Sequence, residues 1–184
     1  MESCSGSQLL KTGLTQLAPL VLIADDDRHS LALLERSFQR LGFATISCTD
    51  GLQALALAQE IPRLFLGIFN WMLPQLDGVE VWSRSRQFRP SLIGVLMIGR
   101  HFLPQARMKI RPQPHFVLTK PLMPATLDSQ VRRLTASACC MAAAAGGWDA
   151  AAAENAYNRQ ASVHEPAATI IMTSDSKPQP GAAE

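Results

Sequence analysis

The sequence has few aromatic residues, no large excess of either charge and no long apolar run. Its 184 residues carry a net charge of +2, which excludes a strongly basic nucleic-acid coat and a whole-chain surface for anionic membranes. No apolar stretch approaches the roughly 20 residues needed to cross a bilayer. The four cysteines, at positions 4, 48, 139 and 140, form neither a disulfide framework nor a paired metal-binding motif. We therefore expect a cytoplasmic protein with no membrane or nucleic-acid partner.

Composition divides the chain into three parts. Residues 1–18 form an N-terminal extension, residues 19–138 hold most of the branched apolar residues, and residues 139–184 are rich in alanine. The last part has five acids and two bases, a charge of −3, whereas residues 1–138 carry +5. A chain of this length supports one domain of ordinary size. We expect one folded domain at 19–138, followed by a low-complexity, disordered tail.

The second half of the expected domain is basic. Between Glu80 and Asp128 the chain has no acidic residue. Eight bases fall in this stretch, namely Arg84, Arg86, Arg89, Arg100, Arg107, Lys109, Arg111 and Lys120. The side of the domain that carries them is either a solvated face or a docking surface for an acidic partner.

Short apolar runs alternate with segments of helical periodicity. Residues 21–24 are continuously apolar, which is typical of a parallel strand buried on both faces. Leu31, Leu34, Phe38 and Leu41 then recur at helical spacing before a glycine. Further strands are predicted at 44–48, 64–69, 92–98 and 116–118, and further helices at 51–60, 79–88 and 125–138, with little more than two helical turns at 101–115. This order predicts a doubly wound parallel sheet in a three-layer α/β sandwich.

Polar residues follow three of the predicted strands, at the edge where parallel sheets bind their ligands. Asp25, Asp26 and Asp27 follow the first strand, Asn70 ends the third, and Lys120 follows the fifth. Paired carboxylates with a lysine suit Mg²⁺ and a phosphate group. Asp27 is better placed to cap the helix that follows it, because aspartate is a preferred N-cap residue. For the other two acids we expect a site, because adjacent acids after a buried strand need a cation or a lysine nearby.

Several motifs together resemble the receiver domains of two-component response regulators, over residues 19–137. They are VLIADDD at 21–27, Leu41-Gly42-Phe43, Asp50-Gly51, NWMLPQLDG at 70–78 and Lys120-Pro121, in the order and at the spacing of that family. The resemblance implies a flavodoxin-like (βα)5 fold. It also implies that Asp25 and Asp26 hold Mg²⁺, with the Met72 backbone carbonyl as a further ligand. By the same resemblance, Lys120 contacts a phosphoryl group and a cis bond precedes Pro121.

Three positions depart from the pattern of the family. Asn70 stands where the family places its phosphate-accepting aspartate, and an amide has no ionised oxygen to attack a phosphorus atom. Gly99 stands where a threonine or serine would contact the phosphoryl group. Val117 replaces the aromatic residue that moves inward on activation. These departures indicate a degenerate receiver, or pseudo-receiver, that is not an enzyme and acts without phosphorylation.

The departures also change what the site is expected to bind. Without the third carboxylate, Asp25 and Asp26 are expected to face Lys120 directly, with Mg²⁺ binding weak or lost. The resemblance implies that partners dock on the face formed by the fourth helix, the fifth strand and the fifth helix. The bases expected on that face are Arg107, Lys109, Arg111, Arg132 and Arg133. The expected partner is a protein, either a histidine kinase or another signalling protein.

Two alternative functions stay open from the sequence. Asp25-x-Asp27 after an apolar strand resembles the haloacid-dehalogenase-type phosphatases, in which the first aspartate attacks phosphate and the second is the acid. The serine or threonine that ends a later strand in those enzymes is absent, because Gly99 stands there. The other alternative is a working receiver that is phosphorylated on a displaced acceptor, either Asp77 or Asp26.

Overall fold

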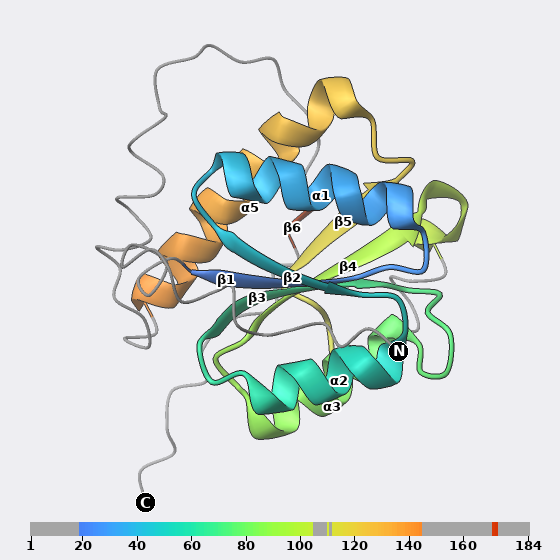
Figure 1. Ribbon diagram of the computed structural model, residues 1–184, viewed down its shortest axis with the longest axis vertical. Coiled ribbons are helices and arrows are strands. Elements are labelled where there is room, and N and C mark those ends of the chain that lie inside the picture. Colours follow the sequence, from blue (N-terminus) through green and yellow to red (C-terminus); the bar gives the residue numbers. More distant parts are fainter. Residues whose placement is uncertain (1–18, 105–109, 111, 145–170, 173–184) are drawn as a thin grey trace, which may run out of the picture.

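The computed structural model describes residues 19–104, 110, 112–144 and 171–172, which form a central sheet with helices on both faces (Figure 1). Within these residues, five parallel strands run in the order β2-β1-β3-β4-β5, and β6 adds an antiparallel edge. The strands are β1 (Leu20–Ala24), β2 (Ala44–Cys48), β3 (Leu64–Asn70), β4 (Ile93–Gly99), β5 (Phe116–Lys120) and β6 (Ile171–Met172). The direction of strand addition reverses between β1 and β3. This confirms the predicted doubly wound, flavodoxin-like fold.

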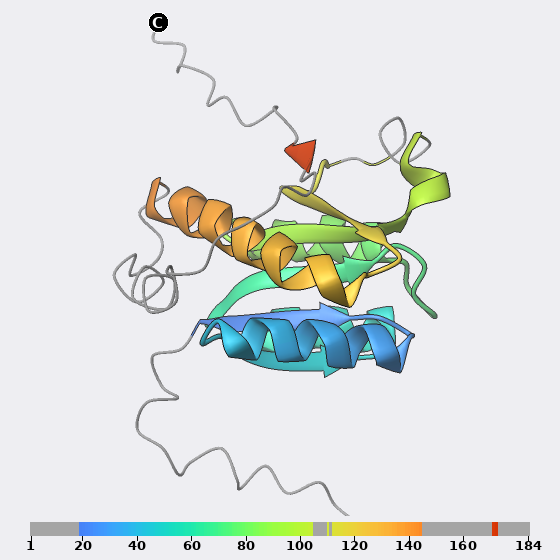
Figure 2. The ribbon, with the colours of Figure 1, turned by 90° about the horizontal axis from the view of Figure 1, so that it is seen from above.

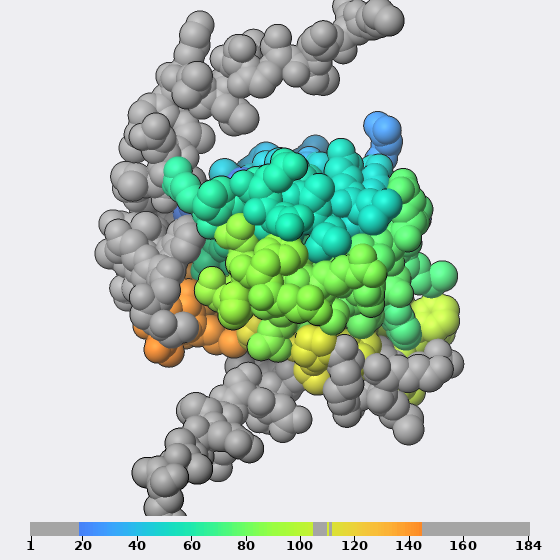
Figure 3. All heavy atoms as spheres, turned by 90° about the horizontal axis from the view of Figure 1, so that it is seen from below, coloured from blue at the N-terminus to red at the C-terminus, as the bar shows by residue number. Residues whose placement is uncertain are grey.

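Two helices of the described residues cover each face of the sheet. The helices α1 (Arg28–Arg40) and α5 (Pro124–Ala144) lie on one face, and α2 (Gly51–Glu60) and α3 (Gly78–Phe88) lie on the other (Figures 1 and 2). Figure 3 shows α2 and α3 side by side over their face. A short 3-10 helix, η1 (Arg100–Phe102), follows β4. No helix in the described ranges is long and apolar enough to cross a membrane.

The central strands are apolar because helices cover both of their faces. All seven residues of β3 are buried, as are the first six of β4. One core packs sheet residues such as Val21 against Phe38 of α1 and Val131 of α5. The other core packs Leu22 and its neighbours against Trp82 of α3. Successive residues of β1 therefore face opposite cores, as the alternation of side chains along a strand requires.

Aspartates set where three of the helices begin. Asp27, Asp50 and Asp77 precede α1, α2 and α3, and each carboxylate accepts at least one hydrogen bond from a backbone N–H of the first helical turn. The first residue of α3, Gly78, packs tightly against the end of β3. A Cβ at Gly78 would lie 2.1 Å from the carbonyl oxygen of Asn70. The caps and this close contact bring the helix starts against the carboxyl edge of the sheet.

The structure differs from the predictions at the C-terminal side of the domain. The helix α5 continues to Ala144, so the domain boundary predicted at 138 lies within it. Alanine has the highest helix propensity, which explains why the helix continues through the alanines that follow Met141. Two residues of the expected disordered tail, Ile171 and Met172, pair with β5. The predicted extension at 1–18 and tail residues 145–170 and 173–184 lie outside the described residues.

Candidate functional site

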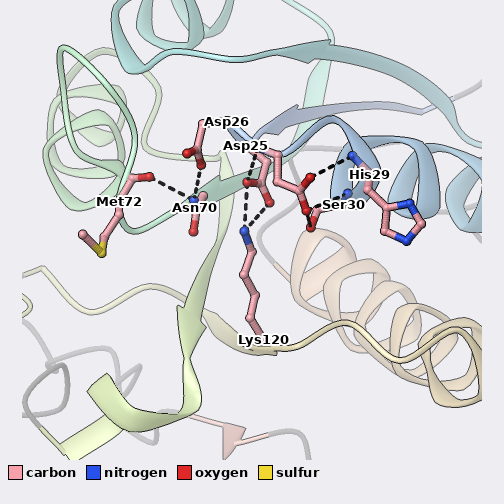
Figure 4. A network of polar contacts seen from close by, with 8 residues as sticks. Asp25, Asp26, His29, Ser30, Asn70, Met72 and Lys120 are labelled. Atoms are coloured by element: carbon pink, nitrogen blue, oxygen red, sulfur yellow. Dashed lines mark hydrogen bonds and ion pairs between the residues drawn. The ribbon is translucent and has the colours of Figure 1, made fainter.

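The carboxyl ends of three strands bring four polar side chains together at one edge of the sheet (Figure 4). Asp25 and Asp26 follow β1, Asn70 ends β3, and Lys120 ends β5. The strand β1 lies beside β3, and β4 separates β3 from β5. Two of these residues that are in contact, Asp25 and Lys120, are 95 positions apart in the sequence. The structure thus brings together the two acids, the amide and the lysine that were singled out from the sequence.

Asp25 and Lys120 form a buried ion pair. The ammonium nitrogen of Lys120 lies 2.6 Å from Oδ2 of Asp25 and donates a 2.8 Å hydrogen bond to Oδ1. The Asp25 side chain is fully buried, and the Lys120 side chain is 23% exposed. Burial raises the pKa of Asp25, because the charged carboxylate loses its water; the hydrogen bonds from Lys120 and from the N–H of Asp27 oppose this rise. Lys120 is therefore the main compensation for a carboxylate that water does not reach.

Asn70 contacts the other acid. Its amide nitrogen donates a 2.9 Å hydrogen bond to Oδ1 of Asp26 and a 3.0 Å hydrogen bond to the backbone carbonyl of Met72. Figure 4 shows the amide between these two oxygens. The expectation that both acids face Lys120 is therefore wrong for Asp26. The reason is that the amide is itself a donor within reach of Asp26, whereas the ammonium is held by Asp25.

The oxygens that would bind a metal already accept hydrogen bonds from this chain. Asp26 and Met72 both contact the Asn70 amide, and both carboxylate oxygens of Asp25 lie beside the ammonium of Lys120. Mg²⁺ takes oxygen ligands at about 2.0–2.1 Å in a near-octahedral shell, so it would have to displace the amide and compete with the lysine. The described part of the chain also has no group of three or more His, Cys, Asp or Glu side chains able to hold a metal ion. The residues in this arrangement do not fit Mg²⁺.

Other predicted residues lie around this cluster. Asp27 caps α1 and accepts a 2.7 Å hydrogen bond from Oγ of Ser30. That bond, together with bonds from backbone N–H groups, holds the pKa of Asp27 below its usual value. Gly99 ends β4 and is paired in register with Lys120 of β5. The bond between Lys120 and Pro121 is cis.

The basic residues expected on a docking face are only partly described. Arg132 and Arg133 lie on α5, and both are half-buried. Arg107, Lys109 and Arg111 lie outside the described residues. Val117, which stands in place of the aromatic residue of the family, is half-buried on β5. The docking face stays a prediction.

Two contacts were not predicted from the sequence, one beside the site and one at the amino ends of β4 and β5. The rings of Trp71 and Phe102 pack edge-to-face with centroids 5.7 Å apart, which connects the loop after β3 to η1. Nδ1 of His115 accepts a 3.0 Å hydrogen bond from the N–H of Gly94. Burial lowers the pKa of His115 to about 4, and the nearby charge of Arg86 contributes. The aromatic residues after β3 and β4 were a weak signal for the first contact, but no sequence pattern identifies the donor that meets His115.

Comparison with protein families and curated proteins agrees with this geometry. Residues 21–132 match the response regulator receiver domain. The transcriptional regulatory protein PrrA of Mycobacterium tuberculosis is 30% identical over 125 residues, which are 68% of this chain and 52% of PrrA. The alkaline phosphatase synthesis transcriptional regulatory protein PhoP of Bacillus subtilis is 29% identical over 118 residues, 62% of this chain and 47% of PhoP. The chain thus spans about half the length of these curated relatives.

Solved structures of receiver domains have the same fold. The REC domain of AraT, a response regulator from Geobacillus stearothermophilus, has a TM-score of 0.55 at 25% identity, over 62% of this chain and 91% of that one. A CheY-like receiver domain protein from Methanospirillum hungatei JF-1 has a TM-score of 0.57 at 19% identity, over 66% of this chain and 96% of that one. Since the family match covers more than half of the sequence and the site lies at the expected strand ends, this chain belongs to the response regulator receiver domain family.

Proposed function

We propose that the chain is a pseudo-receiver, a receiver domain that signals by binding a protein and not by accepting a phosphoryl group. Receiver domains are signalling modules of two-component systems and interact with histidine kinases or phosphotransferases. The observation that carries the proposal is the amide of Asn70 at the end of β3, held between Asp26 and Met72. The proposed setting is the cytoplasm, with a histidine kinase or another signalling protein as the partner.

The chemistry of an amide supports this proposal. Asn70 stands where the resemblance places the phosphate-accepting aspartate. The lone pair of an amide nitrogen is delocalised into its carbonyl, and the oxygen carries no full charge, so neither atom is a useful nucleophile toward phosphorus. Both hydrogen bonds of this nitrogen are also made within the chain. An aspartyl phosphate therefore has no counterpart at this position.

The surroundings of Asn70 support the proposal in two ways. The amide donates hydrogen bonds to Asp26 and to the Met72 carbonyl, two of the ligands that the resemblance assigns to Mg²⁺. We therefore propose that Mg²⁺ binding is weak or lost. Gly99 has no hydroxyl to contact a phosphoryl group, and Val117 stands in place of the aromatic residue that moves inward on activation in the family. The domain thus lacks the aspartate nucleophile, the hydroxyl at position 99 and the aromatic side chain at position 117.

Two contacts disfavour the phosphatase alternative. Asp25, the nucleophile in that mechanism, is fully buried and bound to Lys120, so a substrate has no access to its carboxylate. Asp27, the acid in that mechanism, accepts hydrogen bonds from the first turn of α1, including one from Ser30. Both carboxylates therefore have structural partners in place of a substrate.

A displaced acceptor is the second candidate function, and one observation favours Asp26 for it. Asp26 is exposed, so a phosphodonor can approach its carboxylate. Asp77 is less suited, because it caps α3 with a 2.8 Å hydrogen bond from the N–H of Glu80. The two candidate functions differ in one measurable property, which is the mass of the chain after exposure to a phosphodonor.

Intact-mass analysis after incubation with acetyl phosphate and Mg²⁺ tests the proposal. The native chain should stay unmodified, and Asn70→Asp should gain one phosphoryl group because it regains an ionised nucleophile. Asn70→Ala is the control, since it removes the amide without adding a carboxylate. A phosphoryl group on the native chain would overturn the proposal, and its location on Asp26 would establish the displaced acceptor.

Binding to a purified histidine kinase tests the proposed docking face. Affinity should be the same before and after acetyl phosphate treatment, and it should fall when Arg132 and Arg133 are replaced by glutamine. The matched control replaces Arg84 and Arg86, which lie on α3 on the opposite face of the sheet. Equal losses in the two double variants would mean that overall charge is responsible, and the docking face would be rejected.

A further inference from the structure

A cleft lies at the carboxyl edge of the sheet, on the side of Lys120 away from Asn70. Its volume is about 620 Å³, and its walls are segments that follow β1, β4 and β5. Figure 4 shows His29 and Ser30 on this side of Lys120, with Met72 on the other side. Neither Asn70 nor Met72 lines the cleft. The cleft is therefore separate from the amide contacts, and it has the size and position of a small-ligand pocket in an α/β protein.

Gly99 lines the cleft, although neither backbone geometry nor packing requires a glycine there. Its φ of −58° and ψ of 135° are accessible to any residue. A Cβ at this position would meet only the ring of Phe102 within 4 Å, at 3.3 Å and 3.7 Å. Phe102 is 41% exposed, so its ring has space to shift. The fold therefore does not require a glycine at this position of the lining.

The charges of the lining favour an anion. Two lining side chains, Arg100 and Lys120, are cationic, and the ammonium of Lys120 is shared with the buried carboxylate of Asp25. The imidazoles of His29 and His101 also line the cleft. The acid among the lining residues is Asp27, whose carboxylate accepts hydrogen bonds from the two N–H groups that begin α1 and from Oγ of Ser30. That carboxylate is directed to the helix start, so it offsets the basic groups of the cleft only in part.

Another part of the lining is apolar. Leu33 of α1 and Leu122 and Met123 after β5 contribute to it. The Met123 side chain is 55% exposed, although it is large and hydrophobic. An apolar wall next to basic side chains favours a ligand that has both an anionic group and an apolar body.

We propose that this cleft binds a small organic anion. Its carboxylate or phosphate lies near Arg100 and Lys120, and its apolar body lies against Leu33, Leu122 and Met123. Gly99 lines the space that admits the ligand, so a bulky side chain at that position should narrow it. The cleft shares Lys120 with the polar cluster but does not include Asn70, so ligand binding and the loss of phosphorylation are tested on different residues. Loss of phosphorylation and gain of a ligand are thus separately testable.

An NMR titration of the full chain tests the site with three probes. The probes are hexanoate, phenyl phosphate and inorganic phosphate. Hexanoate or phenyl phosphate should shift the amide signals of residues 99–101 in a saturable manner, with a dissociation constant of about 1 mM or below. Inorganic phosphate should bind at least tenfold more weakly, because it has no apolar body. Comparison of the two organic probes distinguishes a carboxylate site from a phosphate site.

Two variants and a matched control separate this site from general charge attraction. Gly99→Val fills the cleft without adding a hydroxyl, and Arg100→Gln removes one positive charge; each should weaken binding by about tenfold or more. Arg28→Gln removes the same charge from an exposed residue that does not line the cleft, and it should bind as the native chain does. Three results would overturn the proposal. They are no saturable shift with either organic probe, equal binding of inorganic phosphate, and native affinity in Gly99→Val.

Discussion

The two sides of the polar cluster at the carboxyl edge differ in charge. On one side, the charged groups of Asp25 and Lys120 lie 2.6 Å apart, and Asp25 is fully buried. On the other side, the neutral amide of Asn70 holds an exposed carboxylate, that of Asp26, and the carbonyl of Met72. The β1 strand supplies an acid to each side. Asp25 is buried and needs a cation beside it, whereas Asp26 is exposed and needs only a hydrogen-bond donor. The two consecutive acids are therefore stabilised in different ways.

This difference shows which groups of the chain partner each acid. The lysine compensates the buried charge, and the amide satisfies the two oxygens nearest to it. A carboxylate at position 70 would reverse the second arrangement, since it would present an acceptor to two acceptors and would bring like charges together. The residue at position 70 therefore decides whether Asp26 and the Met72 carbonyl have a hydrogen-bond donor beside them.

The largest effect is expected for Lys120→Met, which removes the cation beside Asp25. The free energy of unfolding should fall by about 3 kcal/mol near neutral pH, because a buried carboxylate is left without its partner. The loss should disappear as the pH falls below 3.8, the ordinary pKa of this group, since the raised pKa of Asp25 lets it bind a proton in the folded state first. Urea denaturation at several pH values measures both effects.

The double variant Asp25→Asn, Lys120→Met is the control for that measurement. It contains neither buried charge, so most of the lost free energy of unfolding should return. If the double variant were as unstable as Lys120→Met, the loss would come from packing of the lysine stem. The claim that Lys120 stabilises the fold by compensating the charge of Asp25 would then be wrong.

Asn70→Asp should replace the neutral amide beside Asp26 with a second carboxylate. Without Mg²⁺ the free energy of unfolding should fall by about 2 kcal/mol, because two hydrogen bonds are lost and a carboxylate is placed beside Asp26. Added Mg²⁺ should restore stability by binding the folded state, with an affinity at least tenfold above that of the native chain. Thermal unfolding with and without Mg²⁺ measures this. Asn70→Ala should lose stability without any recovery in Mg²⁺, and the same recovery in both variants would refute the prediction.

The contact between His115 and Gly94 extends the comparison to a half-buried imidazole that the fold keeps neutral. The pKa of His115 is lowered from 6.5 to about 4, so the unfolded chain binds more protons between these values. The stability from neutral His115 is complete above about pH 6.5 and is lost as the pH falls through about 4. The ring is partly exposed, so we expect a loss of about 1 to 2 kcal/mol.

Urea denaturation of the native chain and of His115→Gln at pH 7 and pH 4 isolates this contribution. The glutamine side chain does not titrate. Lowering the pH from 7 to 4 should therefore reduce the free energy of unfolding of the native chain more than that of the variant. A difference that is independent of pH would mean that protonation of His115 has no cost in the fold.

The smallest effect is expected for Arg40→Gln, which breaks an ion pair on the surface. Arg40 and Asp128 lie 2.7 Å apart and join α1 to α5, but their side chains are 57% and 48% exposed. Because water screens such a pair, the free energy of unfolding should change by less than about 0.5 kcal/mol. Urea denaturation in low and high salt checks this value. A loss as large as that in Lys120→Met would show that burial is not what separates the two ion pairs.

The positions of the strands and of the polar edge were predictable from the sequence. The apolar run that ends at Ala24 marks a buried strand, and the polar residues after it lie at the carboxyl edge because all central strands run parallel. The capping role of Asp27 was also predictable, since capping is a local contact within one helical turn. The helix predicted at 125–138 continues to Ala144, through alanines whose helix propensity is high.

The partner of each acid was not predictable. Asp25 and Asp26 are neighbours in the sequence with the same side chain, yet one contacts Lys120 and the other contacts Asn70. The sequence by itself determined the order of strands and helices, the edge at which the polar residues gather and the absence of a carboxylate at position 70, because periodicity and residue identity are local properties. Only the tertiary structure decided which donor meets which oxygen, how deeply Asp25 is buried and where a cleft remains, because these depend on distances between strand ends far apart in the chain.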